Sequence, residues 1–204
     1  MATFSERVGK SRQSQRLRGC ALLIGLLILF AAFSVYFISQ NSTVQRSYIY
    51  PYKYRGLVEH YSHLYGVDSN LAASVILAES KFDDDVHSHR GAIGLMQLMP
   101  DTAAWIAGEL EDENFTVQAL HDPELNIRYG IWYLASLEDE FHENDVLALA
   151  AYNAGRGNVQ DWISTYGWNE DFDNINEIPY LETRAYVAKV LAARGKYKEL
   201  YQKE

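Results

Sequence analysis

The chain has little cysteine and, beyond its first residues, little positive charge. Cys20 is the single cysteine among 204 residues, which excludes an intrachain disulfide. The net charge is −9, and residues 1–18 hold five basic residues against one acid, so the rest of the chain carries −13. A nucleic-acid-binding protein needs a basic face, so DNA and RNA are not expected partners. The histidines lack a cysteine partner or a third ligand at familiar spacing, so we expect no metal site.

Charge is also missing from residues 19–38, "GCALLIGLLILFAAFSVYFI". About twenty helical residues match the roughly 30 Å hydrocarbon core of a bilayer. A buried core helix is seldom apolar on all sides over this length. A cleaved signal peptide, the other alternative, has an apolar region of about 7–15 residues followed by a small-x-small site, and no such site follows Ile38. We therefore expect a single transmembrane anchor here.

The basic residues before this anchor predict its orientation, because positive flanks stay in the cytoplasm. We expect residues 1–18 to be a cytoplasmic head, 39–47 a short tether, and 48–204 a domain outside the cytoplasm. If the apolar segment is instead cleaved as a signal, the same domain is secreted.

Helical periodicity dominates after residue 48. Asp68 and Asp122 are good N-caps, the second followed by proline at the first helical position. The periodic apolar positions predict a helix that ends at Gly66 and further helices over 69–81, from Pro123 for about five turns, from Asn144 to Asn153, and from Pro179 to near Gly195. No repeat of 20–50 residues is present, so we expect one compact, mainly α domain.

The tyrosines at positions 48, 50, 52 and 54 alternate as in a strand. Pro51 interrupts any hydrogen-bonded ladder at this point. We therefore expect an extended aromatic segment that packs on the domain.

One carboxylate lies among the apolar residues of the predicted helix over 69–81. On a helical wheel with Leu71 at zero, Val75 falls at about 40°, Ile76 at about 140° and Glu79 at about 80°. A structural glutamate in such a place would pair with an arginine or a helix N-terminus. A functional one would have a raised pKa and donate a proton near neutral pH, as glycosidic bond cleavage requires.

Five motifs follow one another in the sequence: "ES", "GAIGLMQLMPDTA", "LNIRYGIWYL", "ALAAYNAGRGNV" and "ETRAYV". In this order and spacing, over residues 51–194, the chain resembles the Slt-type lytic transglycosylases of glycoside hydrolase family 23. The resemblance implies a lysozyme-like helical domain with a substrate cleft, related in shape to goose-type lysozyme. It also implies cleavage of the β-1,4 bond between N-acetylmuramic acid and N-acetylglucosamine in peptidoglycan, with no cofactor.

The resemblance also assigns roles to single residues. Glu79 matches the catalytic acid and base of the family. The pair "YN" matches residues that position the N-acetyl group, and the glutamine of "GLMQLM" can donate and accept hydrogen bonds to acetamido or hydroxyl groups. The glycines Gly91 and Gly94 fit a tight loop near the sugar. The residues that match substrate-binding positions are Ser88, Gln97, Met99, Tyr152, Asn153, Glu182 and Tyr186.

Some of these positions have a structural alternative. Met99 and Tyr186 fit core packing as well as cleft contact, and Glu182 fits an ion pair with Arg184.

No obvious second catalytic carboxylate accompanies Glu79. Hydrolytic glycosidases use two carboxylates, whereas a lytic transglycosylase lets the C6 hydroxyl of the substrate attack within the same molecule. The triplet Asp83–Asp85 could supply a second acid, but its position just past the helix favours a solvated loop. A hydrolase like goose-type lysozyme and a catalytically silent wall-binding or scaffolding module are the alternatives.

Overall fold

The computed structural model describes residues 24–202 and divides into two units, Met1–Ile49 and Tyr50–Glu204. The predicted basic head, residues 1–18, and the first part of the predicted anchor, residues 19–23, lie outside the described residues.

The described part of the first unit is helical. A helix covers Ile24–Ser39, α2 covers Ser42–Val44, and a π-helix covers Gln45–Ile49. Helix therefore occupies most of the segment 39–47 that we expected to be a tether. Within residues 24–202 no single helix has the length and apolar character that a bilayer crossing requires. The helices over Ile24–Ser39 and Ser42–Ile49 meet that requirement only as a pair, bent by 71°.

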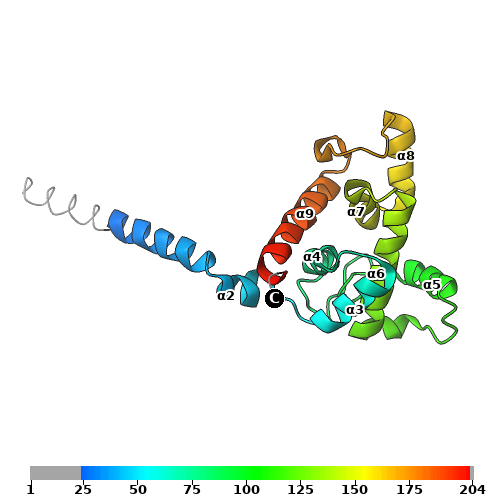
Figure 1. The fold of residues 1–204 in the computed structure, drawn as a ribbon, viewed down its shortest axis with the longest axis horizontal. Helices are drawn as coiled ribbons and strands as arrows, with labels where there is room; N and C mark the ends of the chain where they lie inside the picture. The colour runs from blue at the N-terminus through cyan, green and yellow to red at the C-terminus, as the bar shows by residue number, and fades with distance from the viewer. Residues whose placement is uncertain (1–23, 203–204) are drawn as a thin grey trace, which may run out of the picture. The chain divides into compact units, whose positions relative to one another are not determined.

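The described residues of the second unit are mainly helical, which confirms the prediction of a mainly α domain (Figure 1). Two 3₁₀ turns, Val117–His121 and Ile175–Glu177, lie between helices. The helices are α3 (Arg55–Tyr65), α4 (Ser69–Glu79), α5 (Pro100–Glu109), α6 (Pro123–Glu140), α7 (Asp145–Ala154), α8 (Arg156–Tyr166) and α9 (Leu181–Tyr201).

Two helix ends differ from the prediction. The helix predicted over 69–81 ends at Glu79, and Lys81 and Phe82 after it have positive φ angles of 55° and 62°. The last helix continues past Gly195 to Tyr201, so the predicted end near this glycine was wrong. Packing explains the difference, because the last turns bury apolar side chains that hold the helix together beyond the glycine.

Helix α4 lies at the centre of the second unit. It contacts α3 and α9 directly. These two helices are connected by further contacts through α6 and α7, so the four helices enclose α4 (Figure 1). Its residues from Leu71 to Ile76 have no exposed surface. A helix that is buried on all sides is apolar all round, which explains why α4 lacks a polar face.

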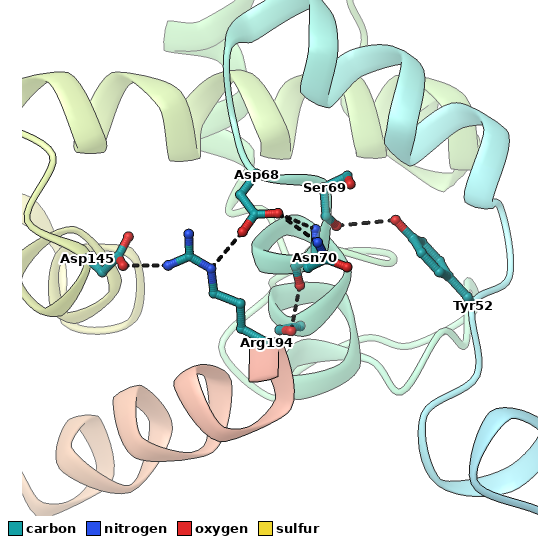
Figure 2. A network of polar contacts seen from close by, with 7 residues as sticks. Tyr52, Asp68, Ser69, Asn70, Asp145 and Arg194 are labelled. Carbon is teal, nitrogen blue, oxygen red and sulfur yellow. Dashed lines mark hydrogen bonds and ion pairs between the residues drawn. The ribbon is translucent and has the colours of Figure 1, made fainter. Parts of the chain in front are cut away.

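A polar network holds the N-terminal end of α4 (Figure 2). Arg194 of α9 pairs with Asp68, the N-cap of α4, at 2.7 Å and also with Asp145 in the first turn of α7. The hydroxyl of Tyr52 donates to the carbonyl of Ser69 at 3.2 Å. Burial raises the pKa of Asp68, but the hydrogen bonds from Arg194 and from the backbone of α4 outweigh it, and the pKa is lowered overall. The carboxylate therefore stays charged.

The aromatic segment before α3 packs on the end of α9. The ring of Tyr52 lies 5.4 Å from that of Tyr197 and 5.2 Å from that of Tyr201. The hydroxyl groups of Tyr197 and Tyr201 donate to the carbonyls of Pro51 and Tyr50. The predicted packing of this segment is therefore confirmed from Tyr50 onward.

Candidate active site

Glu79 is the last residue of α4, where the buried helix reaches a cavity of about 420 Å³. Removal of its carboxyl group from water raises its pKa from 4.5 to about 7. The nearby hydroxyl of Tyr186 and the positive charge of Lys189 oppose this shift and lower the pKa, but they do not offset it. Glu79 therefore has the environment predicted for a proton donor near neutral pH.

Two tyrosines lie next to this carboxyl group. Burial and the neighbouring charge of Glu79 raise the pKa values of Tyr152 and Tyr186 well above 10, so both stay neutral. The hydroxyl of Tyr152 donates to the carbonyl of Met96 at 2.9 Å. The hydroxyl of Tyr186 is buried and has no partner in normal hydrogen-bond geometry, although it lies close enough to Glu79 to lower its pKa. It is the donor best placed to stabilise a Glu79 carboxylate.

The predicted substrate-binding residues gather at the same cavity. Tyr186 is the exception, since it is buried and does not line the cavity. The predicted residues that line it are Glu79 itself, Ser88, Gln97, Met99, Tyr152, Asn153 and Glu182.

The loop between α4 and α5 is folded by its own backbone and by one asparagine. Ile93 forms antiparallel bridges with His87 and with Leu98. Asn126 of α6 accepts from the amide of Met96 at 2.8 Å and donates to the carbonyls of Ile93 and Leu120, each at 2.9 Å. Asn126 is 1% exposed, so these bonds satisfy buried groups that water does not reach.

The backbone and the neighbours of this loop favour glycine at two positions. At Gly94, φ is +77° and an added Cβ would lie 2.4 Å from the side-chain nitrogen of Asn126. A side chain at Gly94 would therefore collide with α6. At Gly91, φ is +90°, but an added Cβ meets no atom within 4 Å, so only the backbone angle favours glycine there.

Gln97 and Ser88 are held by this loop. The amide nitrogen of Gln97 donates to the carbonyls of Val86 (2.9 Å) and Gly94 (2.8 Å), which leaves its oxygen as the group free to contact a ligand. The hydroxyl oxygen of Ser88 accepts from the amide of Ala92 at 2.9 Å, and its proton can still be donated. Gln97 therefore offers an acceptor to the cavity, and Ser88 offers a donor.

The opposite wall comes from α7 and α9. The hydroxyl of Thr183 donates to the side-chain oxygen of Asn153 at 2.9 Å, which orients the amide nitrogen of Asn153 as a free donor. Glu182 is exposed in the first turn of α9. The structure shows no ion pair between Glu182 and Arg184, and Arg184 donates instead to the carbonyl of Ile178.

Met99 precedes α5 and is 41% exposed, so it is a wall residue of the cavity and does not belong to the core. Four further polar residues at the site were not singled out from the sequence. Asn126 could have been found as a polar residue on the buried side of an apolar helix, whereas no sequence signal distinguished Arg90, Thr102 and Tyr133, which line the cavity.

The triplet Asp83–Asp85 and the partly buried Glu138 lie away from this cavity. Asp83 and Asp85 are exposed, Asp84 accepts from the hydroxyl of Tyr54 at 2.8 Å, and none of the three lines the cavity. A larger cavity of about 750 Å³ includes Glu138, whose pKa burial also raises to about 7. That cavity contains none of the predicted site residues, so its size does not make it the better candidate.

Comparison with known proteins agrees with the geometry. The family profile described as the transglycosylase SLT domain matches residues 56–175. The soluble lytic murein transglycosylase of Escherichia coli is 34% identical over 151 residues, which are 73% of this chain and 23% of that protein. Membrane-bound lytic murein transglycosylase C of Actinobacillus pleuropneumoniae is 32% identical over 71% of this chain and 46% of its own length.

Solved structures show the same relationship. The 70 kDa soluble lytic transglycosylase of E. coli matches with a TM-score of 0.69 and 33% identity, covering 74% of this chain and 25% of that one. An inactive mutant of the lytic transglycosylase Slt of Pseudomonas aeruginosa matches with a TM-score of 0.67 and 35% identity over 74% of this chain and 24% of its own. The chain thus spans about a quarter of the length of these enzymes. The matched profile, the shared fold and the cavity around Glu79 agree, and the chain belongs to the family of transglycosylase SLT domains.

Proposed function

We propose that this chain is a lytic transglycosylase that cleaves the β-1,4 bond between N-acetylmuramic acid and N-acetylglucosamine in peptidoglycan without adding water. The observation that carries the proposal is the carboxyl group of Glu79, whose pKa near 7 lets one group donate a proton and then accept one. Membership of the family over residues 56–175 supports the substrate class.

The reaction has two proton transfers. Glu79 donates its proton to the glycosidic oxygen as the bond from that oxygen to C1 of the muramic acid breaks, and the glucosamine residue leaves with a free hydroxyl. The acetamido oxygen of the substrate stabilises the positive charge at C1. The Glu79 carboxylate then takes the proton of the C6 hydroxyl as its oxygen bonds to C1, which closes a 1,6-anhydro ring and restores protonated Glu79.

The other cavity residues position the substrate. The free donor of Asn153 and the ring of Tyr152 lie where they can hold an N-acetyl group, and the oxygen of Gln97 accepts from an amide or hydroxyl. Ser88 donates, and Met99 forms an apolar wall. The hydroxyl of Tyr186 stabilises the Glu79 carboxylate between the two transfers.

A hydrolase is the second candidate function, because Glu182 lines the same cavity as Glu79. A hydrolase would need this second carboxylate to activate water or to attack C1. In a transglycosylase, Glu182→Gln should lower the rate modestly and leave the product as the anhydro sugar. Loss of activity by about 10²-fold or more in that variant would favour the hydrolase.

We also propose that residues 19–38 anchor the chain in the membrane, with residues 1–18 in the cytoplasm, 39–47 as a tether and 48–204 facing the cell wall. The apolar, uncharged sequence and the exposed apolar side chains of its described part support this arrangement. N-terminal sequencing of membrane-extracted protein tests it. A mature start near residues 32–45 in a soluble fraction would contradict an anchor.

Release of soluble fragments from purified sacculi tests the activity itself. The full chain in detergent should release them, and Glu79→Gln should lower the rate by at least about 10²-fold, because no other group supplies the proton. Glu138→Gln is the matched control, since burial raises the pKa of Glu138 equally but in another cavity. A full chain that binds sacculi but releases nothing would be a silent wall-binding module.

A further inference from the structure

A second hollow adjoins the Glu79 cavity. It has a volume of about 490 Å³ and is lined by Asp101, Thr102, Trp105, Tyr133, Arg156 and the glycines at 155 and 157. Thr102, Tyr133 and Gly155 line both spaces, so the hollow continues the Glu79 cavity between α5 and the start of α8. We call this hollow the Trp105 shelf.

The ring of Trp105 is a fixed apolar surface in the shelf. Its exposed fraction is 38%, and it forms T-shaped ring pairs with Trp132 at 5.4 Å and Tyr133 at 6.1 Å between ring centres. Because these neighbours already hold the ring, a ligand that contacts it costs little additional side-chain entropy.

A positive charge lies over this ring. The guanidinium carbon of Arg156 is 5.4 Å from the ring centre of Trp105, and its Nη2 pairs with Glu140 at 2.7 Å. Glu140 also accepts a hydrogen bond from Gln160, which fixes the carboxylate that pairs with Arg156. The Arg156 side chain is 47% exposed, and a guanidinium group has five N–H donors, so donors remain for a second carboxylate.

We propose that the Trp105 shelf binds the acidic stem peptide carried by the muramic acid residue of the substrate. This inference rests on the proposed function, because a strand held at Glu79 must direct its peptide out of the same cavity. The carboxylates of the peptide pair with Arg156, and its small apolar side chains and amide planes contact Trp105. The rest of the domain is acidic, so an anionic peptide needs a local cation such as this one.

A peptide fits these residues better than a further sugar ring. A sugar stacks flat on an open aromatic face, whereas Arg156 already covers one face of Trp105 and two aromatic neighbours pack against its ring. A neutral sugar also gains less from the exposed guanidinium group than a carboxylate does.

The test compares turnover of two substrates by the full chain: glycan strands that keep their peptides, and strands from which an amidase has removed them. The wild type should prefer the peptide-bearing strands. Arg156→Gln and Trp105→Ala should each lower the ratio of the two rates by about tenfold, as expected for one lost charge-assisted contact. Arg128→Gln is the matched control, since Arg128 also lies over a ring, that of Tyr129, and pairs with Asp112, but lines neither space.

Two results would overturn the proposal: an equal fall on both substrates, which would indicate a sugar-binding site, or an unchanged ratio in both variants. Calorimetric titration with the isolated stem peptide separates this proposal from the proposed function, because it needs no turnover. If the chain releases no fragments from sacculi but binds the peptide, and Arg156→Gln weakens that binding, the peptide site stands and the proposed enzyme activity is contradicted. If the chain makes anhydro products but does not bind the peptide, the enzyme activity stands and the peptide site is contradicted.

Discussion

At the scale of single residues, the chemistry of Glu79 comes from the place where its helix ends. The first two turns of α4 are buried on every side, and Glu79 is the residue at which the chain emerges into a cavity. Its carboxyl group therefore loses most of its water without gaining an ion pair in contact, and its pKa rises to about 7. Tyr186 and Lys189 keep the pKa from rising further, so both protonation states are accessible near neutral pH.

The raised pKa of Glu79 predicts a stability effect. The folded state holds the proton more tightly than the unfolded state, so this glutamate costs stability as the pH rises from about 4.5 to about 7 and above. Glu79→Gln removes that cost and should stabilise the protein at pH 8, by at most about 3 kcal/mol, with the gain fading by pH 4. Urea unfolding at the two pH values measures it. A gain of the same size at both would show that ionisation is not the cause.

The charge of Lys189 predicts a change in the pH dependence of turnover. Its ammonium group donates to the carbonyl of Ala78 at 3.1 Å and lowers the pKa of the adjacent Glu79. In Lys189→Met the upper limb of the pH–rate profile should move to higher pH, by less than about one unit because the exposed charge is screened. Lys189→Arg should restore the profile, and Lys196→Met, on the same helix, should leave it unchanged.

Apart from Lys189, the ionisable groups near Glu79 are Tyr133, Tyr152, Tyr186, Glu182 and Arg90. These groups are unchanged in the Lys189 and Lys196 variants, so they do not account for a difference in the pH–rate profile between the variants. An unshifted profile in Lys189→Met would mean that Lys189 acts only as a cap of α4.

At the scale of elements, the sequence predicted the helices that are long or well capped. Asp68 and Asp122 cap α4 and α6 as expected, because their side chains accept from backbone amides two and three residues on. Helices α5 and α8 were not predicted; they bury three and two side chains. The end of α9 could not be predicted from Gly195, because burial of Tyr197 decides it.

The helical wheel assumes one apolar arc on α4, whereas the structure buries residues 71–76 on all sides and leaves residues 77–79 partly exposed. Periodicity could therefore show that the glutamate is among apolar residues, but not that it faces a cavity. Likewise the order of the motifs indicated the loop over 91–99, while its attachment to Asn126 depends on tertiary contacts.

Asn126 provides the prediction for this loop. Asn126→Ala leaves one buried amide and two buried carbonyls without their partners, so it should lower the free energy of unfolding by about 3 kcal/mol and reduce turnover with it. Asn174→Ala, which removes one exposed hydrogen bond to Glu177, is the control and should cost less than about 0.5 kcal/mol. Urea unfolding measures both. Equal, small losses would mean that the loop is held without this asparagine.

At the scale of the whole molecule, one cavity is built from parts that are far apart in the sequence. The end of α4, the loop before α5, the end of α7 and the start of α9 each contribute residues to it. Motif order predicted seven of its lining residues, including Glu79, and packing around α4 brings them together. Their roles in catalysis are the proposal that experiment has to test.

The mass of the muropeptides released from sacculi by the full chain tests the central claim most directly. If the C6 hydroxyl of the substrate attacks C1, the products carry 1,6-anhydromuramic ends, about 18 Da lighter than hydrolysed ends because no water is added. The account predicts these anhydro ends from the wild type and from Glu182→Gln, and no products from Glu79→Gln. Reducing ends from the wild type would contradict it and identify a hydrolase.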